Sequence, residues 1–413
     1  MSSQREYALS VTSQFYFCSL PLRLDTYARC SFGCTYCFAL ARGGNRKIQG
    51  RSFDASTLDR RLDRIATGQV KSAVDEFLAQ GQPIHLGGMT DPFPPGERRT
   101  GTTLRLLKVL ASRQFPAVVS TKSTLFAEDP YLETLASGRF VVQVSLSSMD
   151  ERLLSKVDIG TPSPRHRLSA LERAADAGVP TSVRIQPVLP GREADAFDVL
   201  HASASAGAHH VGVEHLKLPV ERSWRGDTEL KHVLGKQVLE RFVEIGHRIG
   251  REWVLPVEDR LPVAVRLAKA AHARGLSFGF ADNDLLWLSD GTCCCSGADL
   301  MAGFSSHFRC NYTTAVRNGL TDRFITLSSL ETEWIPSHSI ARFVNSRSRL
   351  PSDHGVGASM WSYVESGWNG KPNGNSPAAF FGVEDTGIRD RRGFCVYTLT
   401  DDGRNLARDV ATN

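Results

Sequence analysis

The sequence predicts an α/β fold in which parallel strands alternate with helices. Between about residues 11 and 285, short β-rich runs alternate with runs whose apolar residues recur at helical spacing. One helical run ends in Ala-Gly-Val, a helix stop that is followed directly by a strand. Alternation of this length indicates parallel strands with helices outside them, arranged as a barrel or as an open sheet.

The predicted strands follow one another along this part of the chain. They lie at residues 14–24, 83–88, 117–121, 141–148, 181–189, 210–218, 252–256 and 276–281. Amphipathic helices are predicted between them, for example at residues 103–113 and 167–179. In the second of these helices, Gly178 suits the left-handed position that commonly follows a helix end.

The length of the chain predicts more than one structural part. At 413 residues it exceeds the usual limit of a single core, so one large domain with an appendage is expected. We expect the α/β domain at residues 1–285, an irregular cysteine-rich segment at residues 286–330, and an α+β module at residues 331–413 that contacts a substrate or partner.

Composition narrows the class of protein. Hydrophobic residues make up 41% and charged residues 23%, which is typical of a globular protein in water. The sequence contains no run of about 18 apolar residues, so no membrane span is expected. The N-terminus lacks the basic start and the apolar block of a secretory signal. We therefore expect a cytoplasmic protein. In that reducing compartment the nine cysteines are expected to be metal ligands or reactive thiols. The net charge of +5 permits a phosphate-bearing partner without requiring one.

Three cysteines stand close together in the stretch "YARCSFGCTYCFALARGG". Cys30, Cys34 and Cys37 have the spacing C-x3-C-x2-C. A structural zinc site usually has four ligands, commonly in two paired motifs, and no second pair lies nearby. A buried structural set is the other alternative. Three thiolates on a four-iron cluster would leave one iron without a protein ligand, where a small molecule can bind and receive an electron.

This stretch closely resembles the cluster motif of the radical SAM superfamily. The aromatic residue before the third cysteine, here Tyr36, is also typical of that superfamily. The resemblance implies a [4Fe–4S] cluster whose open iron binds S-adenosyl-L-methionine. It further implies an external one-electron reductant, such as a flavodoxin-like or ferredoxin-like protein, and a 5′-deoxyadenosyl radical that abstracts hydrogen from a substrate.

Further stretches look like successive strand ends of the spore photoproduct lyase-like branch. They are residues 85–97, 120–123, 144–148 and 184–191. The resemblance implies a partial (β/α)6 barrel, in which the carboxyl ends of the strands carry the site. Gly87, Gly88 and Met89 match the edge that meets the methionine amino group, where glycine lets the backbone approach a ligand. In that family the glycine–glycine–methionine sequence is followed by an acidic residue, and Thr90 and Asp91 stand at this place here.

Polar residues at the predicted strand ends are candidates for cofactor or substrate contacts. Lys122 would pair with the methionine carboxylate or else be a solvated lysine. Ser145 and Ser147 would face a ribose or fill the barrel interior. Arg184 and Gln186 share one face of a strand, and a buried arginine needs an anionic partner.

Substrate and catalytic candidates follow the same pattern. Glu214, His215 and Lys217 on the sixth strand are candidate substrate contacts. Asp91 would hold a polar group of cofactor or substrate, or else begin a turn. Asp91, Glu214 and Cys294 are the catalytic candidates.

One departure from the branch concerns hydrogen donation. Spore photoproduct lyase donates hydrogen from a cysteine on the strand that carries "HLGGMTD" here, near Gly88. This chain has no cysteine between Cys37 and Cys293. The resemblance therefore does not carry over the repair of thymine dimers.

A second group of cysteines follows the α/β part. Cys293, Cys294 and Cys295 are consecutive, and Cys310 comes fifteen positions after the last of them. The group would ligate a second cluster, completed by Cys395, Cys18, His307 or substrate. Structural zinc, a redox-active thiol pair or thiol hydrogen donor, and inert cysteines are the alternatives. Cys18 and Cys395 lie in apolar runs and are expected to be buried.

The last eighty residues interleave aromatic and basic side chains. They are Trp334, Trp361 and Trp368 with Arg342, Arg347, Arg349, Arg389, Arg391 and Arg392. Such a pattern binds nucleic acid by phosphate pairing and base stacking, or forms a charged surface over an aromatic core.

These observations together predict a radical SAM enzyme. Its expected substrate is a nucleobase or nucleic acid (DNA, a nucleotide or a modified base) that it repairs, modifies or rearranges. A radical SAM maturase of a peptide or small metabolite is the enzyme alternative. A zinc-stabilised nucleic-acid-binding protein and a redox-sensing cluster protein are the alternatives without turnover.

Overall fold

The computed structural model describes most of the chain. The described residues are 9–41, 53–221, 226–291, 295–346, 350, 355, 357–372 and 374–411. Within them, no helix is both long and apolar enough to cross a membrane.

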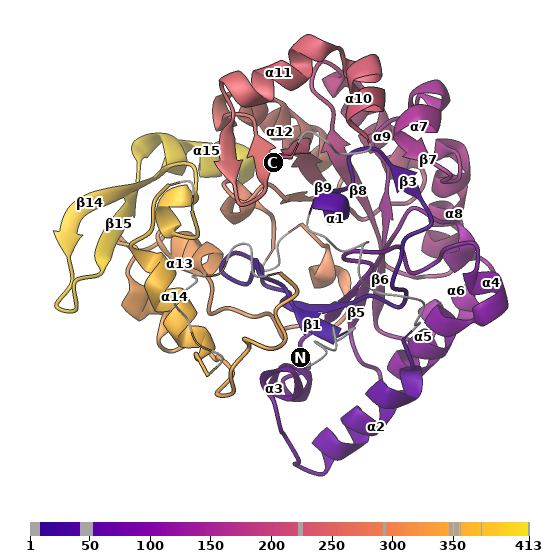
Figure 1. Ribbon diagram of the computed structural model, residues 1–413, viewed down its shortest axis with the longest axis horizontal. Coiled ribbons are helices and arrows are strands. Elements are labelled where there is room, and N and C mark those ends of the chain that lie inside the picture. The colour runs from indigo at the N-terminus through magenta and orange to yellow at the C-terminus, as the bar shows by residue number, and fades with distance from the viewer. Residues whose placement is uncertain are drawn as a thin grey trace.

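An eight-stranded sheet forms the centre of the molecule (Figure 1). Every neighbouring pair is parallel except the first, in which β1 runs antiparallel to β2. The strands, in sheet order, are β1 (Leu9–Val11), β2 (Leu22–Leu24), β4 (Ile84–Leu86), β5 (Ala117–Thr121), β6 (Phe140–Ser145), β8 (Thr181–Val188), β9 (His210–His215) and β13 (Ser277–Phe280). The predicted α/β fold with a parallel sheet is therefore confirmed.

Helices lie around the outside of the sheet (Figure 1). They are α2 (Ala55–Ala66), α3 (Ala73–Ala79), α4 (Glu97–Thr100), α5 (Thr102–Ser112), α6 (Tyr131–Ala136), α7 (Glu151–Val157), α8 (Pro164–Asp176), α9 (Glu193–Ser205) and α12 (Val257–His272). Helix α8 shows why these segments are helical. Ser163 caps its first turn, Pro164 occupies the first position, and Ala170, Leu171 and Ala174 face the core.

The predicted end of α8 is confirmed. Gly178 follows the cap residue and has φ +77°, the left-handed conformation expected for it.

Two predicted strands differ from the structure. Residues 252–256 do contain a strand, β12 (Glu252–Val254), but it belongs to a separate antiparallel sheet with β10 (Lys217–Pro219) and β11 (His247–Ile249). Of residues 14–24, only Leu22–Leu24 is a strand. The aromatic residues before it are buried against the C-terminal module, where Phe17 packs on Phe380, so their β-rich composition reflects burial in a turn.

Shorter elements complete the barrel side of the molecule. They are β3 (Gly33–Cys34), β7 (Asp158–Ile159), α1 (Phe38–Ala41), α10 (Asp227–Leu234), α11 (Lys236–Glu244) and the 3-10 helix Leu125–Ala127.

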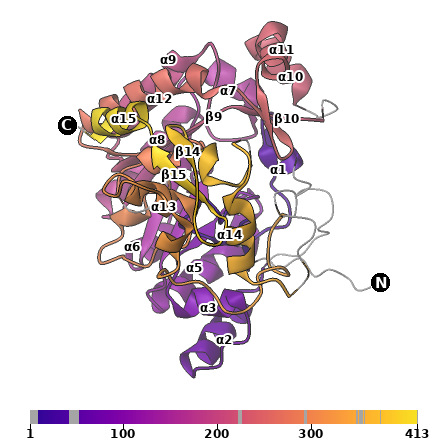
Figure 2. The same cartoon turned by 90° about the vertical axis from the view of Figure 1, so that its left-hand side faces the viewer.

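The C-terminal module covers one side of the barrel (Figure 2). Its elements, with those of the preceding segment, are α13 (Tyr312–Asn318), α14 (Met360–Trp368), β14 (Val383–Arg389), β15 (Cys395–Leu399), α15 (Asp401–Ala411) and the 3-10 helices Leu286–Leu288, Ala298–Leu300, Leu327–Leu330 and Pro377–Ala379. The predicted α+β character is confirmed. Trp368 is fully buried, while Trp334 and Trp361 pack against the core. These tryptophans serve as an aromatic core, the second of the two interpretations of this module.

Residues 295–298, called the plug below, fill the inside of the barrel. The carbonyl oxygen of Cys295 accepts a hydrogen bond from Gln143 Nε2 at 3.2 Å. A Cβ at Gly212 would lie 2.5 Å from that oxygen, and one at Gly279 would lie 2.5 Å from Cys295 Cα. Glycine on β9 and β13 therefore allows the plug to approach the strands. The plug packs directly on the barrel, and the predicted divisions at residues 285 and 330 stay predictions.

Candidate active site

A cavity of about 280 Å³ opens at the carboxyl ends of the barrel strands. The plug residues Cys295 and Ser296 form part of its wall, and Thr12, Gln14 and Asn345 close another side. Most of the predicted site residues line this one cavity: Cys30, Cys34, Cys37, Tyr36, Gly87, Gly88, Met89, Thr90, Asp91, Lys122, Ser145, Arg184, Gln186, Glu214, His215, Lys217 and Cys295. Ser147 is buried behind the cavity wall, and Cys293 and Cys294 lie outside the described residues.

The three clustered cysteines lie at the mouth of the cavity. Strand β3, which contains Cys34, pairs with β7, and the Cys37 N–H donates to the Cys34 carbonyl at 3.3 Å. Burial, and then the Asp91 carboxylate, raises the pKa of Cys30 to about 11. Burial and Asp158 raise the pKa of Cys34 well above its usual value. A bound metal group is what turns such thiols into thiolates, so this donor set fits an iron–sulfur cluster.

A buried ion-pair network stands behind the cysteines. The Lys122 ammonium lies 3.2 Å from Asp158 Oδ2 and 3.1 Å from Ser145 Oγ. Arg167 Nη1 lies 3.0 Å from the same Asp158 oxygen, and the Tyr36 hydroxyl donates to the other. Burial opposes ionisation of Asp158, but Lys122 and Arg167 hold its pKa below the usual range. Lys122 is therefore ion-paired at the cavity and not a solvated surface lysine, and its contact with a methionine carboxylate stays a prediction.

The end of β4 is a backbone cradle. Gly87 has φ +85°, and a Cβ there would lie 2.3 Å from the Ser120 carbonyl oxygen, so only glycine fits. The next turn is fixed by Asp25, whose Oδ1 accepts from the N–H groups of Met89 and Thr90 at 2.9 and 3.0 Å. Gly87 is thus required by packing against Ser120 and Pro92, and contact of this turn with the cofactor stays a prediction.

Asp91 fastens this turn to the next strand. Its Oδ1 accepts from the Phe93 N–H at 2.9 Å and the Thr121 hydroxyl at 2.8 Å, and its Oδ2 accepts from the Lys122 N–H at 2.7 Å. These contacts position the Lys122 backbone at the cavity edge.

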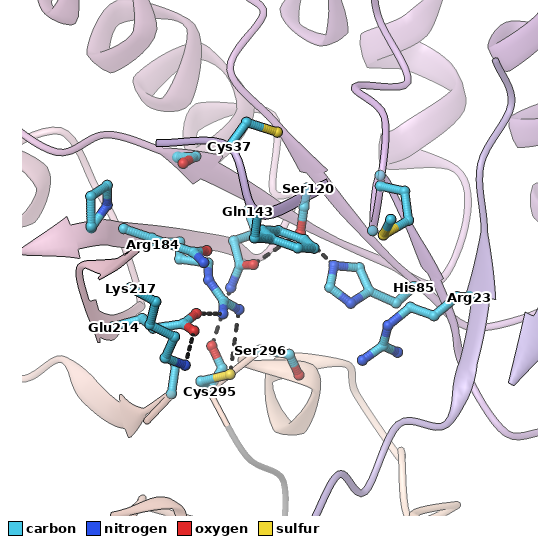
Figure 3. A pocket seen from close by; sticks show the side chains of 18 of the residues that line it. Arg23, Cys37, His85, Ser120, Gln143, Arg184, Glu214, Lys217, Cys295 and Ser296 are labelled. Atoms are coloured by element: carbon cyan, nitrogen blue, oxygen red, sulfur yellow. Dashed lines mark hydrogen bonds and ion pairs between the residues drawn. The ribbon is translucent and has the colours of Figure 1, made fainter. Parts of the chain in front are cut away.

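A chain of hydrogen bonds crosses the inside of the barrel (Figure 3). The ring nitrogen Nε2 of His85 lies 2.7 Å from Ser120 Oγ, which donates to Gln143 Oε1 at 2.9 Å. Because the Ser120 proton is used by Gln143, His85 Nε2 must donate, and its Nδ1 is an acceptor. Burial, with Arg23 and Arg184 nearby, lowers the pKa of His85 well below its usual value and keeps the ring neutral.

The opposite wall carries a charged group (Figure 3). Arg184 Nη2 lies 2.6 Å from Glu214 Oε2, and Lys217 Nζ lies 2.5 Å from Glu214 Oε1. Glu214 is thus the anionic partner that a buried Arg184 requires. Burial opposes ionisation of Glu214, but Lys217 and Arg184 keep its pKa below the usual range. Arg184 Nη1 also lies 3.4 Å from Cys295 Sγ, which joins this wall to the plug.

Several of these residues were missed by sequence reasoning. His85 had a readable signal, because it is a polar residue inside the otherwise apolar predicted strand 83–88. Gln143, Asp25 and Asp158 had none, since their partners are distant in sequence.

The second cysteine group is divided between different surroundings. Cys310 is fully buried and does not line the cavity; its thiol donates to the Leu330 carbonyl at 3.8 Å. Cys18 and Cys395 are buried, as predicted. Among the residues that the structure describes, no three His, Cys, Asp or Glu side chains are arranged to hold a single metal ion. This holds for Cys30, Cys34 and Cys37 as well, whose expected ligand is a cluster in which each thiolate would bind a different iron. Because Cys293 and Cys294 are outside the described residues, the second metal site stays a prediction.

Comparison with known proteins confirms the superfamily resemblance. Residues 24–202 match the family model described as the Radical SAM superfamily. An uncharacterised protein of Mycobacterium tuberculosis is 29% identical over 218 residues, which are 50% of this chain and 62% of that protein. An uncharacterised protein of Acidianus two-tailed virus is 22% identical over 190 residues, 42% of this chain and 62% of that protein. The chain thus spans less than two thirds of the length of these relatives.

Solved structures show the same fold. A Cys-to-Ser mutant of spore photoproduct lyase has a TM-score of 0.52 at 14% identity, covering 67% of this chain and 80% of that one. Another spore photoproduct lyase mutant, with bound AdoMet and dinucleoside spore photoproduct, has a TM-score of 0.50 at 13% identity, covering 65% and 80%. The partial barrel predicted from the sequence is thereby confirmed.

Proposed function

We propose that this protein, whose residues 24–202 belong to the radical SAM superfamily, is an enzyme that cleaves S-adenosyl-L-methionine reductively and abstracts hydrogen from a nucleobase or nucleic acid. The observation that carries the proposal is the meeting of the C-x3-C-x2-C thiols with four strand ends at one cavity. Cys30, Cys34 and Cys37 would hold a [4Fe–4S] cluster. When bound, the cluster and S-adenosylmethionine supply the electron transfer and the adenosyl radical.

The residues next to the cysteines suit the cofactor. Gly87 and Gly88 line the cavity, and Lys122 offers a cation beside Ser145. Because Asp158 already neutralises Lys122 in part, Lys122 would orient a carboxylate without adding an unpaired buried charge. The walls of the cavity would exclude water from the radical.

The far half of the cavity suits a polar heterocycle. Arg184, Glu214 and Lys217 present donors and an acceptor on one wall, and His85 presents an acceptor on another. Proteins recognise a single unstacked base by placing both hydrogen-bond donors and hydrogen-bond acceptors along its polar edges. The fold of spore photoproduct lyase, which has been solved with a dinucleoside photoproduct, supports the same substrate class.

The test is an anaerobic turnover experiment. Reconstituted protein is mixed with S-adenosylmethionine, dithionite and one of six additions: single-stranded DNA, duplex DNA, ultraviolet-irradiated DNA, free nucleosides, a peptide mixture or a mixture of small metabolites. We expect one of the first four additions to raise 5′-deoxyadenosine formation at least about tenfold, with deuterium transferred from a deuterated base. Stimulation by a peptide or small metabolite alone would contradict the substrate class. Cys37→Ala is expected to abolish cleavage, and Cys395→Ala, which changes a thiol outside the cavity, is its matched control.

A further inference from the structure

A histidine–aspartate pair lies where two neighbouring strands end. His215 is the last residue of β9, and Asp282 follows β13 by two positions. The two strands are parallel, with Val213 opposite Phe280, so these ends meet at the cavity side of the sheet. His215 Nδ1 lies 2.6 Å from Asp282 Oδ2, and the His215 N–H lies 3.3 Å from the same oxygen.

The carboxylate decides the orientation and tautomer of the imidazole. Burial opposes ionisation of Asp282, but Arg260 and His215, and then Lys217, hold its pKa well below the usual range. An ionised carboxylate only accepts hydrogen bonds, so His215 Nδ1 carries the proton that is shared with it. In the neutral ring, Nε2 is then a hydrogen-bond acceptor.

His215 stands in the wall of the main cavity. His215 lines that cavity, whereas Asp282 lines a small separate hollow with Arg260 and Asp284. The ring therefore stands between the two spaces, with Nδ1 on the Asp282 side. His215 is 8% exposed, and its Nε2 is buried with no hydrogen-bond partner among the described residues. Buried polar atoms are normally hydrogen-bonded, so this acceptor calls for a donor on a water molecule or a ligand.

Charged groups from several elements lie near the His215–Asp282 pair. Asp282 is in direct contact, and Glu214 precedes His215 on β9. Lys217 lies between them, 3.8 Å from Asp282 Oδ1 and paired with Glu214. From the elements packed behind, Glu252 lies on β12 opposite Pro219, and Arg260 of α12 lies 3.4 Å from Asp282. Asp282 is thus the carboxylate in contact with the ring, and Lys217 is shared with Glu214 and Glu252 nearby.

We propose that His215 exchanges a proton with a weakly acidic N–H or O–H group of the substrate, and that Asp282 positions it. In the forward direction the substrate N–H or O–H bond breaks, its electron pair stays on nitrogen or oxygen, and the proton moves to His215 Nε2. The proton on Nδ1 remains shared with Asp282. The step is a proton transfer that needs no oxidant or reductant. This proposal rests on the proposed function only in assuming that the substrate occupies the main cavity.

The geometry also limits the substrate. The acidic N–H or O–H must reach Nε2 while the carbon that loses hydrogen stays in the same cavity. A ring imide of a pyrimidine and a sugar hydroxyl both supply this chemistry. Thymidine, N3-methylthymidine and 3′-O-methylthymidine, alone or within an oligonucleotide, separate the two sources.

The first test does not depend on the substrate. Reconstituted protein labelled with [15N]histidine is compared with His215→Gln by NMR, so that the His215 signals can be assigned. We expect a protonated Nδ1 and an unprotonated Nε2 at neutral pH. Asp282→Asn is expected to abolish this preference, while Asp290→Asn, which removes the partner of His272 outside the cavity, leaves it unchanged. A protonated Nε2 on a neutral His215 ring in the unaltered protein would overturn the proposal.

The second test uses whichever thymidine probe raises 5′-deoxyadenosine formation. His215→Ala is expected to lower product formation about 100-fold, and added imidazole to restore part of it. His272→Ala, in an ion pair outside the cavity, is expected to lose little and to show no effect of imidazole. Equal product formation in His215→Ala and the unaltered protein would overturn the proposal. If no nucleic-acid probe raises 5′-deoxyadenosine, the substrate class fails, and the tautomer measurement still decides the role of His215.

Discussion

The two ends of the cavity are built in different ways. At the mouth, Cys30, Cys34 and Cys37 come from eight consecutive residues, and the loop that holds them is anchored by one short strand pair. At the closed end, the plug meets β6 and β9, and the Gln143–Cys295 hydrogen bond joins residues 152 positions apart. The mouth is therefore a local motif placed on a scaffold, whereas the closed end exists only after the whole chain has folded.

The largest effect is expected at the glycine cradle near the mouth. Gly87→Ala places a Cβ 2.3 Å from the Ser120 carbonyl oxygen at φ +85°. Strain and overpacking together should lower the free energy of unfolding by about 3 kcal/mol, measured by urea denaturation. Gly178→Ala separates the two causes, because Gly178 has φ +77° with nothing within 4 Å and should cost only about 1 kcal/mol. Equal losses would show that the contact with Ser120 is unimportant.

The closed end should be almost as sensitive. Gly279→Ala would place a Cβ 2.5 Å from Cys295 Cα, and this backbone contact should cost about 2 kcal/mol. Displacement of the plug should also make the buried Cys295 thiol faster to alkylate, as mass spectrometry of the modified peptide would show. Gly96→Ala is the matched control, since nothing lies within 4 Å of that position. An unchanged alkylation rate would mean that the strand glycines do not hold the plug.

The ion pair between the two ends should contribute less. Arg184→Met leaves Glu214 paired with Lys217, so we expect a loss of about 1.5 kcal/mol, less than for a buried carboxylate left alone. The lowered pKa of Glu214 means that its contribution is present above the unfolded pKa and is lost as pH falls through the folded one. The difference between unaltered protein and variant should therefore shrink below about pH 4. A difference that grows toward acid would contradict this pairing.

The smallest effect is expected away from the cavity. Cys310 is buried in the core, and Cys310→Ala should cost about 1 kcal/mol through lost packing. The iron content of the reconstituted Cys310→Ala variant, measured by colorimetric analysis, should equal that of the unaltered protein. Loss of iron in this variant would instead support the second metal site.

The comparison explains how far sequence reasoning reached. The three cysteines, the Gly87 turn and the Gly178 helix end could be predicted because each depends on neighbouring residues. Residues 14–24 and 252–256 were assigned to the central sheet because composition does not distinguish a barrel strand from a buried turn or a side sheet.

The partners across the cavity could not be predicted for a related reason. Asp158 meets Lys122, and Asp282 meets His215, only through strand order and register. An aspartate that follows a strand or helix is also a common turn or cap residue, so its sequence context carries no sign of a distant partner.

The most direct test of the central claim is an iron and sulfide count. Anaerobically reconstituted protein is compared with the Cys30→Ala, Cys34→Ala, Cys37→Ala triple variant, with Cys310→Ala as the control. We expect about four irons and four sulfides per chain in the unaltered protein and the control, with almost none in the triple variant. Zinc without iron, or a full complement of iron in the triple variant, would contradict the assignment of the three cysteines.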